Sequence, residues 1–175
     1  LVGVKINHVA KTDFEGFKNL TDALGGVTVT NQHASPEYPA GQLELDGDEA
    51  LAYVRERKTL AEGDISRGQR QQAWLKAMMA ETLSPGVLLN PGKLGDVIEA
   101  GTSNTVVDND LTTGRIRSEA IKMRNVRGGD IHFVTAPFSG YGTTSRGESI
   151  DVLDEPGMDR LSDALRTDDM EGYEE

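Results

Sequence analysis

Residues 47–72 read GDEALAYVRERKTLAEGDISRGQRQQ and contain two helix patterns separated by a loop. The first pattern predicts a short helix from Asp48 to Arg55 that delivers apolar side chains to the core. Residues 58–64 contain a glycine and are predicted to form the loop. A longer helix is predicted from about Ile65 to Leu83, where Ser84-Pro85-Gly86 ends it.

Basic residues are concentrated in this part of the chain. Between Tyr53 and Lys76, six basic and three acidic residues give a local charge of +3, whereas the whole chain has a formal charge of −11. The basic residues are Arg55, Arg57, Lys58, Arg67, Arg70 and Lys76. This contrast marks the segment as a candidate anion-binding site.

The position of two arginines within the longer helix suggests a ligand. Arg67, Arg70, Gln71 and Trp74 are three or four positions apart, so they are predicted to share one helix face. Arg67 and Arg70 lie in or near the first turn, where backbone N–H groups are unpaired and the helix dipole is positive. A bound anion would offset that unfavourable arrangement through charge-assisted hydrogen bonds. We expect only one of Arg55 and Arg57 to face the same site as Arg67.

The same residues have a structural interpretation. Arginines close to Glu56, Glu62 and Asp64 are also typical of surface ion-pair networks that contribute little energy, and the charge pattern alone does not separate the two interpretations. Asp64 by itself is predicted to cap the helix that begins near Ser66. Trp74 is predicted to belong to the core.

Composition excludes several classes of protein. A chain of 175 residues with 37% hydrophobic residues suits one globular domain. The sequence has no Cys and its three His are scattered, which argues against disulfides and a zinc site. The acidic balance argues against nonspecific nucleic-acid binding. No apolar run approaches the length of a membrane span, and residues 1–6 read as a strand entered in mid-fold, which suggests a fragment.

The remaining patterns alternate between helices and strands, which predicts an α/β layered fold. Phe14, Phe17, Leu20 and Leu24 follow helical spacing behind a cap at Thr12 or Asp13, and Gly25-Gly26 ends that helix. The other predicted elements are strands over Val2–Ile6, Val27–Thr30 and Ile131–Thr135, a loop over 31–42, and helices over Leu88–Ala100 and Asp110–Met123. Residues from Ser139 onward are polar and acidic, and Thr167–Glu175 is predicted to fray.

Two spaced motifs resemble the signature of the LytR-CpsA-Psr family. They are Gly47-x-x-Ala50-Leu51-Ala52-Tyr53-Val54-Arg55-x-Arg57-Lys58 and Gly63-Asp64-x-x-Arg67-x-x-Arg70-Gln71-Gln72. Upstream, Ile6-Asn7-His8, Asp13-Phe14-x-Gly16-Phe17 and Ala23-Leu24-Gly25-Gly26-Val27 also match the family pattern. The resemblance covers about Leu1 to Pro137.

The resemblance implies a fold and an activity. It implies a layered αβα fold with a central mixed sheet flanked by helices, of which residues 1–138 are the C-terminal portion and residues 139–175 a polar acidic extension. Family members are envelope proteins, anchored in the membrane with the domain on its extracytoplasmic face. They are phosphotransferases that move glycopolymers from a polyprenyl-pyrophosphate carrier to peptidoglycan, generally with Mg²⁺.

The resemblance also implies roles for individual residues. Arg55, Arg67 and Arg70 are expected to hold the pyrophosphate and to offset charge on the leaving lipid phosphate, and Arg57 is a weaker member of the set. Asp64 is expected to orient an arginine, with a role as a base toward the sugar hydroxyl as the alternative. Gln71 is expected to hydrogen-bond a phosphate oxygen. Trp74, Leu75 and Met78 are candidates for the wall of an apolar tunnel that takes the polyprenyl chain.

One expected part of the family pattern does not precede Leu1. In the family, the first half of the domain supplies sheet strands, a Pro-Arg-Asp segment, further arginines and an aspartate that helps to hold Mg²⁺. We therefore expect the Mg²⁺ ligands to lie mainly outside this chain, and we expect residues 1–175 alone to show no transferase activity.

Two other classes of function remain open from the sequence. The first is a non-catalytic module that binds a polyprenyl phosphate or an anionic glycan through the same arginines. The second is an envelope-related transcriptional attenuator, against which the overall acidity and the lack of a basic helix-turn-helix count. The Gly, Arg and Asp content suggests a GC-rich actinobacterium, which would favour an arabinogalactan-like polymer.

Overall fold

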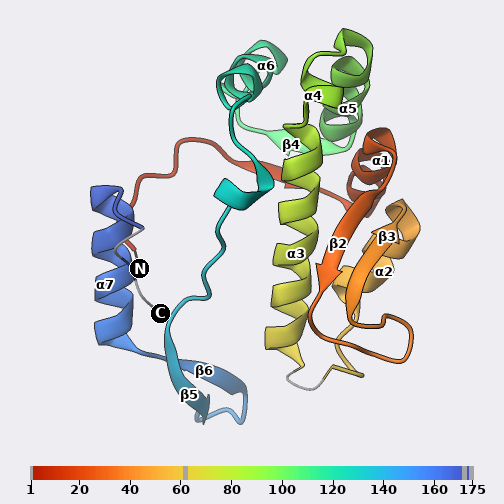
Figure 1. Ribbon diagram of the computed structural model, residues 1–175. Helices are drawn as coiled ribbons and strands as arrows, with labels where there is room; N and C mark the ends of the chain where they lie inside the picture. The colour runs from red at the N-terminus through yellow and green to blue at the C-terminus, as the bar shows by residue number, and fades with distance from the viewer. Residues whose placement is uncertain (1, 61–62, 171–172, 174–175) are drawn as a thin grey trace. The chain divides into compact units, whose positions relative to one another are not determined.

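The computed structural model describes residues 2–60, 63–170 and 173 of the chain (Figure 1). Ala61 and Glu62, which fall in the loop predicted over residues 58–64, lie outside the described residues. The chain folds into two compact units. The larger unit is residues 8–132, and the smaller unit combines residues 1–7 with residues 133–175.

The larger unit is built on a hairpin and three helices that pack together. The hairpin consists of the antiparallel strands β2 (Val27–Asn31) and β3 (Gly41–Leu45). Helix α3 (Asp64–Thr82) packs along β2, and helices α1 (Phe14–Leu24) and α2 (Gly47–Arg55) pack against each other (Figure 1). Side chains alternate between buried and exposed along β2, as expected for a strand with one face on a core.

Local sequence signals fix the ends of α1 and α2. Asp13 caps α1 by accepting a hydrogen bond from the Gly16 N–H at 2.8 Å, and Gly25 ends the helix in the left-handed conformation. Asp46 and Glu49 form a reciprocal capping box at the start of α2. Each cap contributes about 1 kcal/mol, and both helices begin within one residue of their predicted starts.

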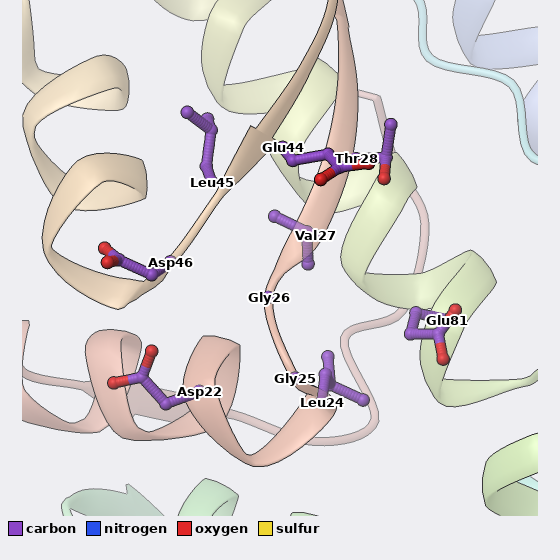
Figure 2. Close-up of a pocket in the computed structure, with 10 residues that line it drawn as sticks. All are labelled: Asp22, Leu24, Gly25, Gly26, Val27, Thr28, Glu44, Leu45, Asp46 and Glu81. Atoms are coloured by element: carbon purple, nitrogen blue, oxygen red, sulfur yellow. The ribbon is translucent and has the colours of Figure 1, made fainter.

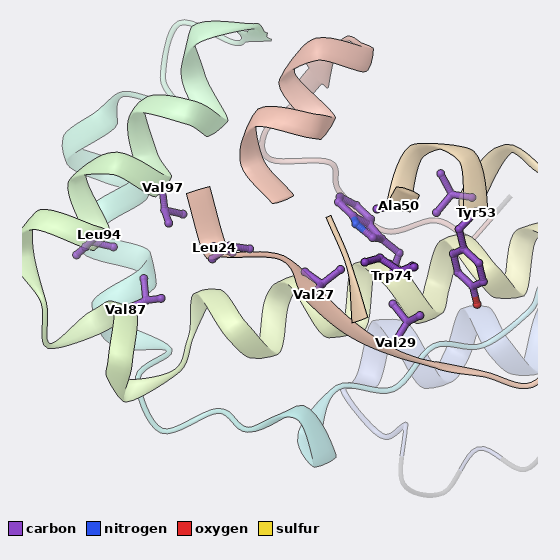
Figure 3. Packing of buried hydrophobic residues seen from close by; sticks show 11 residues of the cluster. Leu24, Val27, Val29, Ala50, Tyr53, Trp74, Val87, Leu94 and Val97 are labelled. Carbon is purple, nitrogen blue, oxygen red and sulfur yellow. The ribbon is translucent and has the colours of Figure 1, made fainter. Parts of the chain in front are cut away.

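The core of this unit gathers apolar side chains from the hairpin and the helices (Figure 3). Trp74 stacks on Phe17, with ring centroids 4.0 Å apart and an interplanar angle of 24°, which joins α3 to α1. Val29, Ala50 and Tyr53 are fully buried. Trp74 is therefore a core residue, as the sequence predicts.

The rest of the larger unit is helical apart from one short strand pair. Strand β1 (Ala10–Thr12) pairs antiparallel with β4 (Thr105–Val107). The side chain of Asp108, just beyond β4, accepts from the Val9 N–H at 2.7 Å and lies 3.2 Å from His8 Nδ1. The remaining elements are α4 (Pro85–Leu88), α5 (Pro91–Ser103), α6 (Thr113–Lys122) and the 3-10 turn η1 (Gly128–Asp130).

The smaller unit has regular structure in the segment that the sequence predicts to be a polar extension. Strands β5 (Phe138–Thr143) and β6 (Ser149–Leu153) form an antiparallel hairpin that leads into helix α7 (Glu155–Thr167). The Ser162 hydroxyl donates to the Val2 carbonyl at 2.9 Å, which holds the first residues of the chain against α7.

The predicted mixed α/β class is confirmed, but the predicted central sheet is not formed by the described residues. Their strands form three separate two-stranded antiparallel pairs. Within the described chain, Val2–Ile6 and Ile131–Thr135 form no strand, so both strand predictions are wrong there. Their β-branched residues favour a strand only where a neighbouring strand supplies hydrogen bonds. None of the described helices has the length and apolar character needed to cross a membrane.

Candidate functional site

A carboxylate shared by two arginines lies at the start of α3. Arg57 Nη2 lies 2.9 Å from one oxygen of Asp64, and Arg67 Nη2 lies 2.7 Å from the other. The three side chains are between one third and three fifths exposed. Because one negative charge faces two positive charges, this cluster keeps a net charge of +1 at the surface and can attract an anion.

Asp64 does not have the capping role that was predicted for it alone. It is the first residue of α3, and the N-cap position is occupied by Gly63, which has no side chain to cap with. Gly63 has φ +53°, a left-handed value that favours glycine. The Asp64 carboxylate is instead occupied by the two guanidinium groups, so its geometry is that of a residue that orients arginines.

Arg55 lies on an aromatic ring instead of a carboxylate. Its Cζ atom is 4.6 Å from the ring centroid of Phe14, the first residue of α1. No carboxylate among the described residues lies within ion-pair distance of Arg55. The arginine also ends α2, where a positive charge complements the helix dipole. Arg55 is exposed, so its guanidinium is accessible to a ligand.

Gln71 connects the two helices that carry the arginines. Its exposed side chain donates from Nε2 to the carbonyl of Val54 at 3.3 Å. This hydrogen bond joins α3 to the last turn of α2, next to Arg55. Gln71 therefore has a structural contact in addition to the phosphate contact that the family resemblance implies.

Arg70 lies in the interior, whereas the sequence places it among the residues that bind pyrophosphate, a role that stays a prediction. Arg70 is 1% exposed, and its Nη1 lies 2.9 Å from a carboxylate oxygen of Glu56. Its Nη2 donates to the carbonyl of His33 at 2.6 Å and to the hydroxyl of Ser35 at 3.1 Å. With these partners the guanidinium is engaged inside the protein and is not available to a surface ligand.

The predicted common face of α3 is therefore divided in two. Arg70 and Trp74 lie on its buried side, together with Ser66. Arg67 and Gln71 lie on the more exposed side. A spacing of three or four residues places side chains on neighbouring rows of a helix, and the edge of the core falls between these rows.

A pocket of about 500 Å³ elsewhere in the larger unit has the wrong charge for a pyrophosphate (Figure 2). It lies where α1 runs into β2 and is bordered by β3. The acidic residues on its wall are Asp22, Glu44, Asp46 and Glu81. An anion would be repelled there, so the arginine cluster, and not this pocket, is the candidate site.

The described residues do not offer a metal site. They contain no group of three or more His, Cys, Asp or Glu side chains placed to hold an ion. Asp64, the acidic residue in the arginine cluster, already has an arginine on each oxygen.

Two residues of this region were not singled out from the sequence. Phe14 was assigned to the α1 pattern, yet it is 58% exposed and contacts Arg55. Glu56 enters the sequence analysis only as a member of a possible surface network, yet its side chain is 15% exposed and is paired with buried Arg70. The one signal for Phe14 in the sequence was its position as an aromatic residue at the start of the helix, three positions before Phe17.

Together, these features define a mixed α/β protein that presents a paired-arginine cluster at the beginning of a long helix. The chain belongs to the LytR_cpsA_psr family, whose model matches residues 1–167. The predicted family is thereby confirmed, and the match continues beyond Pro137 through most of the smaller unit.

The match to named relatives covers most of this chain but only part of each relative. The cell wall biosynthesis protein LcpA of Corynebacterium glutamicum is 38% identical over 161 residues, which are 88% of this chain and 30% of LcpA. The polyisoprenyl-teichoic acid–peptidoglycan teichoic acid transferase TagU of Oceanobacillus iheyensis is 27% identical over 166 residues, which are 93% of this chain and 49% of TagU. The chain thus spans less than half the length of these two relatives.

A solved structure shows the same fold. The crystal structure of B. subtilis TagV superposes with a TM-score of 0.76 at 21% identity and covers 97% of this chain and 66% of the TagV chain.

Proposed function

We propose that this chain forms part of a phosphotransferase that attaches glycopolymers from a polyprenyl-pyrophosphate carrier to peptidoglycan. The observation that carries the proposal is the cluster in which Arg57 and Arg67 share the Asp64 carboxylate. Family membership supports the reaction class, since the relative TagU is named as a transferase of teichoic acid to peptidoglycan. With this reaction we also propose a location on the extracytoplasmic face of the membrane, in contact with lipid-linked glycopolymer and peptidoglycan.

In the proposed mechanism, the arginines bind the pyrophosphate and stabilise the leaving group. An acceptor hydroxyl attacks the phosphorus that carries the glycopolymer and releases its proton to water, and the bond from this phosphorus to the bridging oxygen breaks. The leaving polyprenyl phosphate takes the electron pair, and Arg55, Arg57 and Arg67 offset the charge that develops on it. Asp64 holds two of these guanidiniums in place. Gln71 lies one helical turn after Arg67, and its proposed role is to donate to a phosphate oxygen.

Magnesium is expected from the family, but the described residues do not fit a resident Mg²⁺. A magnesium site needs several oxygen ligands, and no such group is assembled among them. Asp64 would have to release both arginines to become a ligand. The steps above therefore use the arginines alone.

Calorimetry with a soluble carrier analogue tests the proposal. Residues 1–175 are titrated with geranyl pyrophosphate and with inorganic pyrophosphate, and Arg67→Ala is expected to abolish or strongly weaken both interactions. Arg115→Ala is the matched control, because Arg115 is an exposed helical arginine on α6, outside the cluster. Equal binding by wild type and Arg67→Ala would show that the cluster is not the site.

The two other classes predict different results in the same experiments. A non-catalytic receptor would bind the analogue through the same arginines, but adding the rest of the family domain would produce no transfer. A transcriptional attenuator would shift DNA in a salt-sensitive manner, which the formal charge of −11 opposes.

A further inference from the structure

We propose that Glu56 is a positioning residue that fixes the two arginines beside it, Arg55 and Arg57, and that buried Arg70 is its anchor. The inference rests on the proposed function, because it concerns the same arginine site. It assigns a role to the ion pair between Glu56 and Arg70, which lies inside the protein although Glu56 stands between Arg55 and Arg57 in the sequence.

The Glu56 carboxylate is fully engaged. One oxygen accepts from Arg70 Nη1 and from the Ser35 hydroxyl, both at 2.9 Å, and the other accepts from the Thr59 hydroxyl. The Thr59 hydrogen bond, followed by those from Ser35 and Arg70, lowers the pKa of Glu56. The side chain is thus held as a carboxylate in one orientation.

Arg70 cannot follow a movement of Glu56 toward the surface. Besides its bonds to His33 and Ser35, its Cζ lies 4.6 Å from the ring centroid of Tyr53 and 5.3 Å from that of Tyr38. A buried guanidinium is tolerated only with such partners, because losing them would leave an uncompensated charge. The anchor is therefore rigid, and it joins α3 to the loop between β2 and β3.

The anchored carboxylate determines where its two neighbours point. Glu56 follows the last residue of α2 and has an extended backbone, with φ −62° and ψ 135°. In an extended segment successive side chains point to opposite sides, so an inward Glu56 directs Arg57 outward, while Arg55 is directed by the last turn of α2. With Glu56 held inward, Arg55 reaches Phe14 and Arg57 reaches Asp64.

The pair has an electrostatic consequence as well. A free carboxylate between Arg55 and Arg57 would pair with one of them and repel a pyrophosphate. Arg70 takes up this charge inside the protein, so Glu56 does not compete with a ligand for either outer arginine.

The test uses residues 1–175 with Glu56→Gln, with Arg70→Lys as the conservative change, and with Glu99→Gln as the control. Glu99 is an exposed glutamate on α5, outside the network. Binding of inorganic pyrophosphate is measured by calorimetry, and the arginine Nε–H signals are recorded by NMR without ligand. Glu56→Gln is expected to weaken binding about tenfold even though it removes a negative charge. The affinity of Arg70→Lys for pyrophosphate is expected to lie between those of wild type and Glu56→Gln.

The NMR spectra separate positioning from a loss of stability. In Glu56→Gln, the Arg55 and Arg57 signals are expected to move toward those of mobile arginines, while the indole N–H signal of core residue Trp74 stays in place. Glu99→Gln is expected to change neither signal nor affinity.

Unchanged arginine signals together with wild-type affinity in Glu56→Gln would overturn the inference and leave the proposed function intact. Stronger binding by Glu56→Gln would overturn it too, since it would show that removal of charge outweighs positioning. If the wild type binds no pyrophosphate, the proposed function fails, and the NMR result alone then decides whether Glu56 holds the arginines.

Discussion

Arg55 and Phe14 form a cation–π contact, with the guanidinium carbon 4.6 Å from the ring centroid. The contact links the last residue of α2 to the first residue of α1. It provides Arg55 with a support that carries no negative charge. A carboxylate in the same place would hold the arginine equally well but would compete with an anionic ligand.

Replacing Phe14 with Leu tests this support. Leu keeps an apolar side chain but lacks the ring face, so Arg55 loses a contact worth about 0.5–1 kcal/mol at an exposed site. We expect pyrophosphate affinity to fall about two- to fivefold, measured by calorimetry. Phe14→Tyr retains the ring face and is the control. Equal affinities for the Leu and Tyr variants would show that the contact does not matter for binding.

Replacing Asp64 with Asn separates orientation from charge. The variant loses the carboxylate that binds Arg57 and Arg67, and the cluster gains one positive charge. We expect weaker binding of pyrophosphate, because the arginines are no longer held in position. We also expect a steeper dependence of affinity on salt, because salt screens the long-range attraction by mobile arginines more than it screens direct hydrogen bonds from fixed ones. Calorimetry between low and physiological salt measures both effects. Tighter binding at all salt concentrations would rule out an orienting role.

Replacing Gly47 with Ala is expected to disrupt the packing between α1 and α2. A Cβ atom at this position would lie 2.7 Å from the Lys18 carbonyl oxygen and 2.9 Å from its Cα. The Gly47 N–H also donates to Asp22 at 2.8 Å, and moving the helices apart would break this bond. We expect the free energy of unfolding to fall by about 1–3 kcal/mol in urea denaturation.

Gly95→Ala is the matched control for that change. Gly95 lies within α5, and nothing lies within 4 Å of an added Cβ. Alanine there is expected to stabilise the protein by about 0.5–1 kcal/mol, as for other glycines in exposed helix interiors. Destabilisation of the same size in both variants would contradict the packing explanation.

Acid denaturation reports on Asp108. The Val9 N–H, followed by His8 and the Asp110 N–H, lowers the pKa of Asp108 to about 2. A carboxyl whose pKa is lower in the folded state stabilises the protein above its unfolded pKa of about 3.9, and this contribution is lost as the pH falls toward 2. Wild type is therefore expected to lose stability relative to Asp108→Asn between about pH 4 and pH 2, measured by urea denaturation. Free energies of unfolding that change with pH in the same way for both proteins would contradict this.

Elements with local signals could be predicted from the sequence. The start of α1 follows from the capping side chain of Asp13, and its end follows from Gly25. Strand β3 was missed because its short run follows a loop rich in Pro. The segment Ile131–Thr135 was wrongly predicted as a strand, because pairing depends on partners that are distant in sequence.

The site was predictable in its residue types and less so in its geometry. The spacing correctly indicated a basic cluster that includes Arg57, Asp64 and Arg67, although their roles in binding remain predictions. The same spacing could not show that Arg70 faces inward, because its partners come from the loop after β2 and from two tyrosines. Periodicity identifies the rows of a helix but does not show where the core ends.

The pairing of β1 with β4 has a consequence for folding kinetics. It brings together positions such as His8 and Asp108, which are 100 residues apart in the chain. Closing so long a loop costs conformational entropy. The hydrogen bonds of two three-residue strands offset this cost only when the intervening helices are already compact. This pairing therefore belongs to the last steps of folding, and substitutions in it should accelerate unfolding while leaving the folding rate nearly unchanged.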